Sequence, residues 1–471
     1  MICKKAYLIA LLIIVVTKFV IHAYILLKAP LLPGLDGGYY AVQVRSILIN
    51  GKLYYSAPPI TFYIFALFAQ VLLALGYGPL NICVIDGIKL GLSAMVALSG
   101  VPAYLFAYEL FKRRDIAIYF TLILLWHPYF IIISGGASLY KNSVGVFFLF
   151  SYLYFLFRSI DEIDSRVHIL TIIFFVLNAL THILIFGIAL ALTLVINIIY
   201  VFLWRIKGLP LNNRFIKTII ANYILVIFAF VAIILFFPEF FGTYYKFESF
   251  IERFPFEFIP LILPIILFGF DLIVVITWLL ILVTAYELIF RRKHFLSKNK
   301  APLLMILIAM EVLAIFLLWP FFESQYRIRF LFVSFIPFTV LSSFNISNLL
   351  KKKGEALVAF LTIMLIFTPA ILRNYSHTFP CISFAETQDI LVMRQYVEKE
   401  KSIVYTRPGL HYWVTWFLDV PSDYHLNKEN LENAKESYKY VYVILPKLVR
   451  NVPPWWKLIF RGSSLSLYLV T

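Results

Sequence analysis

Long apolar runs follow one another from the start of the chain to residue 372, and they constrain its fold more than any other feature. A helix of about 20 apolar residues crosses the hydrocarbon core of a bilayer, which is about 30 Å thick. Hydrophobic residues make up 62% of the chain and charged residues only 14%, too little charge to cover a soluble protein of this length. We therefore expect an α-helical polytopic membrane protein. The runs cover residues 6–27, 59–78, 82–109, 116–133, 143–158, 167–204, 215–237, 258–290, 301–320, 328–349 and 356–372.

Two of these runs need interpretation before the membrane spans can be counted. The 167–204 run is too long for one crossing and is interrupted at Thr181–His182, so we expect two short helices there. We interpret the 258–290 run as one long, tilted helix. The first run stays apolar to Leu27 without a small-x-small cleavage site, so we expect a retained span and not a signal peptide. The count comes to about 10–12 transmembrane helices.

Basic clusters between the runs predict the orientation. Lys and Arg concentrate in cytoplasmic loops, so the N-terminus with Lys4 and Lys5 is expected inside. Inside to inside requires an even number of crossings before residues 112–114, so we expect the 59–78 run to lie in the interface or re-enter. Segments 28–58, 134–142, 238–257 and 321–327 and everything after residue 373 are then outside. The clusters expected inside are residues 4–5, 112–114, 205–217, 291–293 and 351–353.

The formal net charge of +16 reflects the basic residues between the hydrophobic spans. They flank hydrophobic spans and suit contact with anionic headgroups of membrane lipids. We expect no nucleic-acid partner. Three cysteines, Cys3, Cys83 and Cys381, suggest neither a disulfide framework nor a metal-ligand pair.

The composition changes at residue 373, where charges, prolines and polar residues appear. Strand-like runs at 401–406 and 439–445 and a closing hairpin that turns at Gly462–Ser463 alternate with helical patterns at 384–399 and 427–436. We predict two domains, a transmembrane domain of residues 1–372 and a small extracellular α/β domain of residues 373–471.

The loop after the first span reads LPGLDGGYYAVQVRSILINGKLYYSAPP over residues 32–59 and holds one acid, Asp36. Asp36 is placed to cap a helix over residues 38–50 that Gly51 would close, and this helix suits the membrane–water boundary. The same carboxylate could act as a general base toward an acceptor hydroxyl. The residues alone favour the cap.

A loop with Asp36, a Tyr39–Tyr40 start to an interfacial helix and a Pro58–Pro59 pair resembles the GT-C superfamily of membrane glycosyltransferases. Protein O-mannosyltransferases and lipid A aminoarabinose transferases are the most similar groups. The resemblance implies that Asp36 is the catalytic base and that Tyr39 and Tyr40 bind substrate. This chain departs from the pattern in two places: Gly37 stands where O-mannosyltransferases have a second acid, and Ala57 where relatives carry a basic residue or His.

Three further residues have a functional and a structural interpretation. Lys89 resembles the basic residue of the family, and a charge inside a span is usually functional, but Asp86 three residues earlier could simply pair with it. Lys141 could attract a phosphate or extend to the interface. His182, at the break of a long run, could face a polar cavity, although a buried structural histidine is favoured.

Arg327 and Arg329 lie two residues apart at the start of a late span, ahead of Pro337. They cannot share one helical face, so at least one should turn away from lipid, where its guanidinium suits a phosphate. The other interpretation is a pair with Glu323. Trp413 and Trp416 could stack on sugar, but a core role is favoured.

Acids also gather in the 238–257 loop, where an interfacial helix could cover the site. We expect no metal and no cofactor, because no Asp-x-Asp pair or His cluster is present. The acids of the loop are Glu239, Glu248, Glu252 and Glu257.

The resemblance thus implies a glycosyltransferase in the cell (plasma) membrane. It would move a sugar from a polyprenyl (dolichyl or undecaprenyl) phosphate donor to a lipid, glycan or protein acceptor. The alternative is a transporter or flippase of lipid-linked sugars, a class that usually shows paired halves and broken midplane helices. Here the polar residues gather at one membrane face.

Overall fold

A computed structural model of the protein describes residues 2–161, 164–207, 272–290, 301–319, 324–349, 353–376, 378–449 and 451–470, with six single positions between 220 and 235. These residues form a helical bundle and a smaller α/β domain. The helices that precede the α/β domain are α1 (Ile2–Lys28), α2 (Gly37–Asn50), α3 (Ile60–Ala74), α4 (Leu80–Leu98), α5 (Gly100–Phe111), α6 (Arg114–Trp126), α7 (Pro128–Ser134), α8 (Tyr140–Asp161), α9 (Ser165–Ala179), α10 (Ile183–Lys207), α14 (Leu272–Phe290), α16 (Ala301–Leu317), α17 (Ser324–Val333), α18 (Phe335–Leu349) and α19 (Lys353–Ser376).

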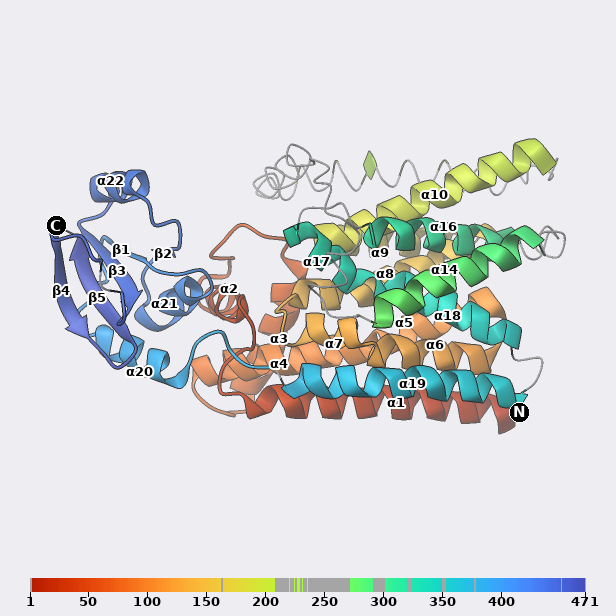
Figure 1. The fold of residues 1–471 in the computed structure, drawn as a ribbon, viewed down its shortest axis with the longest axis horizontal. Helices are drawn as coiled ribbons and strands as arrows, with labels where there is room; N and C mark the ends of the chain where they lie inside the picture. The colour runs from red at the N-terminus through yellow and green to blue at the C-terminus, as the bar shows by residue number, and fades with distance from the viewer. Residues whose placement is uncertain are drawn as a thin grey trace.

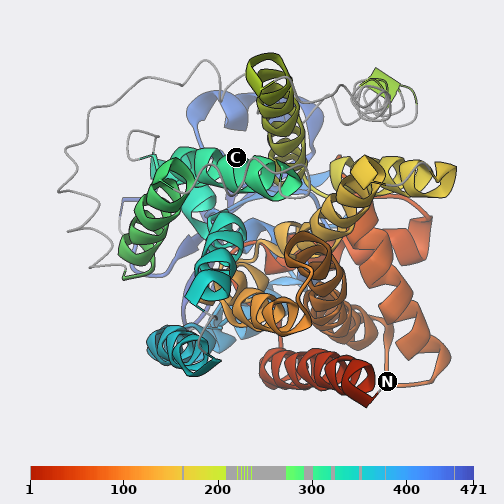
Figure 2. The same cartoon turned by 90° about the vertical axis from the view of Figure 1, so that its right-hand side faces the viewer.

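The C-terminal α/β domain sits at one end of the bundle, opposite the end at which α1 begins (Figure 1). Figure 2 looks along the bundle from that N-terminal end and shows the blue C-terminal domain behind the helices. Helix α2 lies between the two parts and packs on α3, α4 and the C-terminal domain. The fold therefore brings the loop before α2 to the junction of the two domains.

Membrane-length apolar helices are a plain feature of the described residues. Five stretches are long and apolar enough to cross a bilayer, and α6 with α7 makes a sixth if that bent pair is one span. We expected residues 116–133 to be one unbroken span, but α6 and α7 meet at His127 with a bend of 48°. Pro128 explains it, because proline has no N–H and restricts the preceding residue to extended geometry. The five stretches are 5–28, 80–111, 183–202, 273–290 and 326–348.

Other expected spans are matched in part. The 167–204 run is divided as expected, with α9 ending at Ala179 and α10 beginning at Ile183. The 328–349 run is broken at Ser334, between α17 and α18. Helix α14 begins at Leu272, and the first part of the expected 258–290 helix lies outside the described residues, as does most of the 215–237 run.

The C-terminal domain is built on a five-stranded sheet in the order β2-β1-β3-β5-β4. Strands β1, β2 and β3 are parallel, whereas β3–β5 and β5–β4 are antiparallel. The expected strands and the hairpin turning at Gly462–Ser463 are present. The elements of this domain are α20 (Phe384–Met393), β1 (Ser402–Tyr405), α21 (Leu410–Leu418), β2 (Ser422–Asp423), α22 (Lys428–Ser437), β3 (Tyr440–Pro446), β4 (Trp456–Arg461) and β5 (Leu465–Val470).

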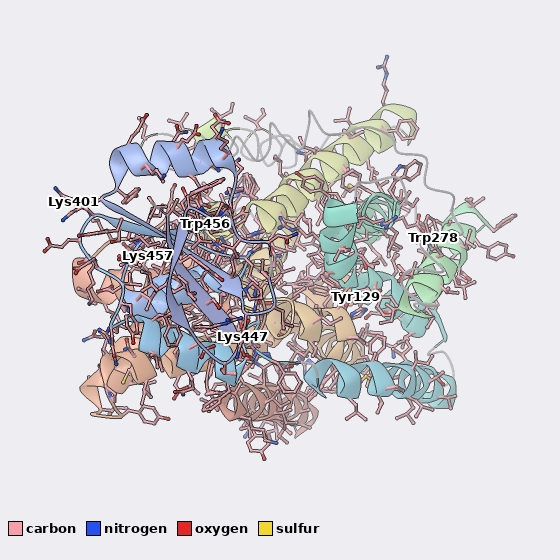
Figure 3. All side chains as sticks on the ribbon, turned by 60° about the vertical axis from the view of Figure 1, so that its left-hand side comes forward. Tyr129, Trp278, Lys401, Lys447, Trp456 and Lys457 are labelled. Atoms are coloured by element: carbon pink, nitrogen blue, oxygen red, sulfur yellow. The ribbon has the colours of Figure 1, made fainter. Side chains whose placement is uncertain are left out.

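Helices cover both faces of this sheet. Side chains on one face, such as Val441 and Val443, pack with Ala434 of α22. Those on the other face join the same core as α20, α21 and the bundle. The first helix of the domain ends at Met393, six residues before the expected end, and α21 was not expected. Figure 3 shows Lys401, Lys447 and Lys457 on this domain, and Tyr129 and Trp278 in the bundle.

Candidate functional site

The loop that carries Asp36 is clamped from two sides. The Pro33 carbonyl accepts hydrogen bonds from Ser138 Oγ at 3.0 Å and from Tyr140 Oη at 2.8 Å. On the other side the Gly34 N–H donates to the Phe379 carbonyl at 2.8 Å. The 134–142 loop and the segment leading into the C-terminal domain therefore hold this turn together.

Asp36 stands at the first turn of α2, but it does not cap the helix in the expected way. It occupies the N-cap position with φ −91° and ψ 8°, and its side chain makes no capping hydrogen bond. At the other end Gly51 closes the helix as expected, with φ 71° and its N–H bonded to the Ile47 carbonyl. The carboxylate is thus not used to start the helix.

Tyrosines from three parts of the chain surround this turn. Tyr40 packs on Tyr140 of α8 with ring centroids 4.6 Å apart, and its Oη accepts from the Lys141 N–H at 3.3 Å. Tyr39 packs on Tyr55 at 5.8 Å and on Tyr412 of α21 at 5.2 Å. Both α2 tyrosines that were expected to bind substrate therefore belong to this cluster.

The electrostatics link Asp36 to these rings. Burial raises the pKa of Tyr39, Tyr40 and Tyr412 above the usual range, and the negative charge of Asp36 raises the pKa of each one further. The phenols are therefore protonated and neutral at physiological pH. They can donate hydrogen bonds to an anionic oxygen in the site.

Lys141 brings positive charge to the same place. Its Nζ lies 5.2 Å from the centroid of the Tyr39 ring and 5.6 Å from that of Phe62. The ammonium group of Lys141 is thus held against ring faces in the cluster, and its binding of a phosphate stays a prediction. One carboxylate, several phenols and one ammonium group meet where the bundle joins the C-terminal domain.

Helix α21 closes the cluster from the side of the C-terminal domain. A Cβ added to Gly38 would lie 2.8 Å from the backbone nitrogen of Trp413, so the absence of a side chain at Gly38 permits the close approach of α2 and α21. Arg45 Nη1 donates to the Trp416 carbonyl at 2.8 Å, and its guanidinium lies over the Trp416 ring at 4.6 Å. Trp413 and Trp416 are buried, in agreement with the expected core role.

Lys89 and His182 have structural partners in the fold. Lys89 is 1% exposed, and its Nζ pairs with Asp86 Oδ1 at 3.0 Å and donates to the Ala29 carbonyl at 2.6 Å. The pairing with Asp86 is the structural interpretation of this lysine. His182 accepts a hydrogen bond from the Leu184 N–H at 3.2 Å and so caps the start of α10.

The arginines of α17 divide as helical spacing requires. Arg327 is 8% exposed and Arg329 is exposed, while α17 packs on α7 and α16. Glu323, the alternative partner, lies outside the described residues, as do the acids of the 238–257 loop. Within the described ranges, no group of three or more His, Cys, Asp or Glu residues could hold a metal ion.

Sequence reasoning missed two rings of the cluster. Tyr140 immediately precedes Lys141, and its place next to that lysine was the available signal. Tyr412 lies more than 370 residues after Asp36, in a helix that was not expected, so no local pattern could have assigned it.

Comparison with solved structures identifies the fold. An oligosaccharyltransferase from Archaeoglobus fulgidus, crystallised with Zn and sulfate, matches with a TM-score of 0.60 and 13% identity over 92% of this chain and 68% of its own. The aminoarabinose transferase ArnT from Cupriavidus metallidurans matches in its apo state with a TM-score of 0.53 and 14% identity, over 100% of this chain and 98% of its own.

ArnT bound to undecaprenyl phosphate also matches, with a TM-score of 0.51 and 14% identity over 98% of both chains. No protein-family model matches the chain, and no curated protein matches its sequence. Both neighbours are GT-C enzymes, so the chain has the GT-C fold that the loop motif led us to expect.

Proposed function

We propose that the protein is a glycosyltransferase that moves a sugar from a polyprenyl-phosphate donor to an acceptor at the outer membrane face. The observation that carries the proposal is the surroundings of Asp36. Its carboxylate lies among buried tyrosines and Lys141 and makes no capping hydrogen bond to α2. An ArnT structure with undecaprenyl phosphate supports a lipid-phosphate donor for this fold.

The chemistry would be a displacement at the anomeric carbon. Asp36 accepts the proton of the acceptor hydroxyl, whose oxygen forms the new bond to the sugar. The bond between the anomeric carbon and the phosphate oxygen breaks, and the lipid phosphate leaves with the electron pair. Lys141 and the neutral phenols would stabilise that charge, and Arg327 or Arg329 would bind the phosphate.

Asp36→Asn tests the proposal. Because Asn keeps the shape of Asp and is an equally good residue at a helix N-terminus, the variant should fold and melt like the parent protein. The loss of the base should lower turnover by about 10²–10⁴ with donor affinity unchanged. Release of polyprenyl phosphate and binding of labelled donor would be measured on the same purified protein.

Glu432→Gln is the matched control, because Glu432 is 65% exposed on α22 and far in sequence from the cluster. It should keep full turnover. Normal turnover by Asp36→Asn would show that Asp36 is not the base.

The placement in the cell follows from the same proposal. The C-terminal domain and the Asp36 loop lie at one end of the bundle, and we place that end outside the plasma membrane. The donor sugar and the acceptor would meet at the junction of the transmembrane domain (residues 1–372) and the C-terminal domain (residues 373–471).

A further inference from the structure

A continuous row of aromatic rings leads from the Asp36 cluster across the C-terminal domain. Tyr39 and Tyr55 lie 5.8 Å apart, and each contacts Tyr412, at 5.2 and 5.7 Å. From Tyr412 the row continues to His411 at 3.7 Å. Tyr424 follows at 4.8 Å and His425 at a further 3.9 Å. We call these six residues the aromatic row: Tyr39, Tyr55, Tyr412, His411, Tyr424 and His425.

The row opens toward solvent as it leaves Asp36. Tyr39, Tyr55 and Tyr412 are half-buried and His411 is buried, whereas Tyr424 is 40% exposed and the side chain of His425 is 59% exposed. At the open end His425 Nδ1 lies 3.0 Å from Asp423 Oδ1, which holds the imidazole in place. The row is therefore open to solvent at Tyr424 and His425, and the half-buried Tyr412 and Tyr39 connect that open end to the Asp36 cluster.

The chemistry of the row suits a carbohydrate. Every ring presents an apolar face and carries a polar atom at its edge, and sugars combine apolar C–H faces with hydroxyl groups. Hydroxyls and imidazole nitrogens both donate and accept hydrogen bonds, as sugar hydroxyls require. An acyl chain would leave these polar edges without partners when it covered them, which is costly.

The continuity with Asp36 decides which substrate the row would hold. A chain stacked on the exposed rings would have its end at Tyr39 and Tyr412, next to the carboxylate. We propose that the aromatic row binds a glycan acceptor, with the receiving sugar at Tyr39 and Tyr412 and the following sugars on Tyr424 and His425, while the buried His411 ring supports Tyr412 and Tyr424. This inference rests on the proposed function and adds the class of the acceptor.

Binding of free sugars to the full-length protein in nanodiscs, without donor, gives the first test. The probes are defined hexose and N-acetylhexosamine oligosaccharides, followed by saturation-transfer NMR and titration. Tyr424→Ala should weaken binding by about threefold to tenfold, because one ring is lost from the stack. Tyr424→Phe keeps the ring face and should bind almost like the parent protein.

Tyr396→Ala is the matched control. Tyr396 is 45% exposed in the same domain and stacks on Phe460, outside the aromatic row. This variant should bind oligosaccharides normally. Absence of oligosaccharide binding, or equal binding by Tyr424→Ala and Tyr396→Ala, would overturn the proposal.

Transfer kinetics separate this inference from the proposed function. With a glycan acceptor, Tyr424→Ala should raise the acceptor KM and leave kcat and donor affinity unchanged. If the protein transfers sugar but Tyr424→Ala changes neither glycan binding nor the acceptor KM, the row is not the acceptor site and the glycosyltransferase proposal stands. If no polyprenyl phosphate is released with any acceptor while Tyr424→Ala still weakens glycan binding, the row stands as a glycan site and the proposed reaction is wrong.

Discussion

The buried charge of Lys89 has two hydrogen-bond partners that account for its position in the bundle. Its Nζ bonds Asp86 on its own helix and the Ala29 carbonyl just after α1, and the side chain is 1% exposed. Removing one partner of a buried pair leaves the other charge unpaired. The resemblance had placed Lys89 in substrate binding, and a variant can separate that role from the structural one.

Lys89→Met should lower the stability of the folded protein by on the order of 3 kcal/mol. The reason is that Asp86 and the Ala29 carbonyl both lose the Lys89 ammonium group that donates to them. Thermal unfolding in detergent would measure the effect, and a second change, Asp86→Leu, should recover part of it. If Lys89→Met melted like the parent protein but no longer bound the donor, Lys89 would be a substrate-binding residue.

Asp389 fixes the hairpin of the C-terminal domain. Its Oδ1 accepts from the Ser463 N–H at 2.9 Å, and its Oδ2 accepts from the N–H groups of Ser464 at 2.7 Å and Leu465 at 2.8 Å. Burial acts to raise the pKa of this carboxyl, but these backbone donors outweigh it, so the pKa is lowered. The charged form is therefore part of the folded state.

Asp389→Asn should destabilise the domain by about 2–3 kcal/mol at neutral pH, because an amide NH₂ would replace one acceptor oxygen. A lowered pKa means that this stability is present above the ordinary Asp pKa of about 4 and is lost as pH falls through the folded value. Melting of both proteins from pH 7 to pH 3 should show their difference shrinking only below about pH 4. If the difference in stability between the parent protein and Asp389→Asn did not change with pH, the charge of Asp389 would not contribute to stability.

Residue types and local spacing were enough to select Asp36, Tyr39 and Tyr40, because a glycine-framed acid before a helix is a local pattern. The same reasoning overlooked Lys18 and His22, which lie in an apolar run. In the structure Lys18 stacks on Trp126, and His22 lies within 3.0 Å of hydroxyls on α4 and α7. Such partners become visible only when helices distant in sequence are packed together.

Among the elements, α2 is flanked by two glycines, Gly34 before it and Gly51 after it, that are needed for different reasons. Gly34 has φ +75°, and a Cβ there would lie 1.8 Å from Ser138 Oγ and 2.6 Å from the Gly136 carbonyl. Gly51 has φ +71°, but nothing lies within 4 Å of its added Cβ. Both positions need a left-handed backbone, and only at Gly34 would a side chain also clash with neighbouring atoms.

Gly51→Ala should therefore cost only the backbone strain, about 1–2 kcal/mol, and keep turnover in the folded protein. Gly34→Ala should cost more and also lower turnover, because the 134–142 loop and the Asp36 turn must move apart. Paired melting and transfer assays would compare the two variants. Equal losses in both would mean that the clamp around Pro33 does not position Asp36.

Element boundaries were predictable where the signal lies in the chain itself. Gly51 closes α2 and Gly462–Ser463 turns the last hairpin, as glycine and turn residues predict. The bend at Pro128 was missed because an unbroken apolar run was given more weight than one proline. Helix α21 was missed because its sequence, LHYWVTWFL, is rich in residues that also favour strands.

At the scale of the whole molecule, Arg45 joins the two domains. Its Nη2 lies 3.2 Å from Asp419 Oδ1, in addition to the bonds with the carbonyls of α21. These contacts link residues about 370 positions apart, so no local pattern could predict them. Composition and apolar runs predicted apolar helices followed by a small C-terminal sheet, but not how the two parts dock on each other.

Arg45→Met should loosen this docking, because a half-buried guanidinium that donates to several acceptors is removed from the interface. Amide hydrogen exchange should become faster in α21 and at the start of α2, and slower transfer should follow. Arg45→Lys should restore only part of the docking, since one ammonium group cannot reproduce the several donors of the planar guanidinium. Asp419→Asn, at a side chain that is 60% exposed, should change little, and an equal effect of the two substitutions would contradict the argument.

The topology of the molecule depends on whether α3 crosses the membrane. Helix α4 runs back along α1, since His22 meets Ser93 and the Ala29 carbonyl meets Lys89. The first turns of α4 therefore extend past the end of α1. Helix α3 packs on that part, because a Cβ on Gly87 would lie 2.5 Å from the Cα of Ala69.

The 15 residues of α3 span about 22 Å, less than the hydrocarbon core. These contacts favour our expectation that residues 59–78 stay at the end of the bundle that carries α2. In that case two crossings separate Lys5 from Lys112, and residues 112–114 lie on the cytoplasmic side.

Cysteine labelling of intact cells decides between the two topologies. In a background without native cysteines, Lys447→Cys should react with an impermeant maleimide in intact cells, because Lys447 is exposed on the C-terminal domain. Arg113→Cys should react only after permeabilisation. If α3 crossed, an N-terminus inside would place Arg113 outside, so labelling of Arg113→Cys in intact cells would show a third crossing and reverse the orientation proposed for every later span.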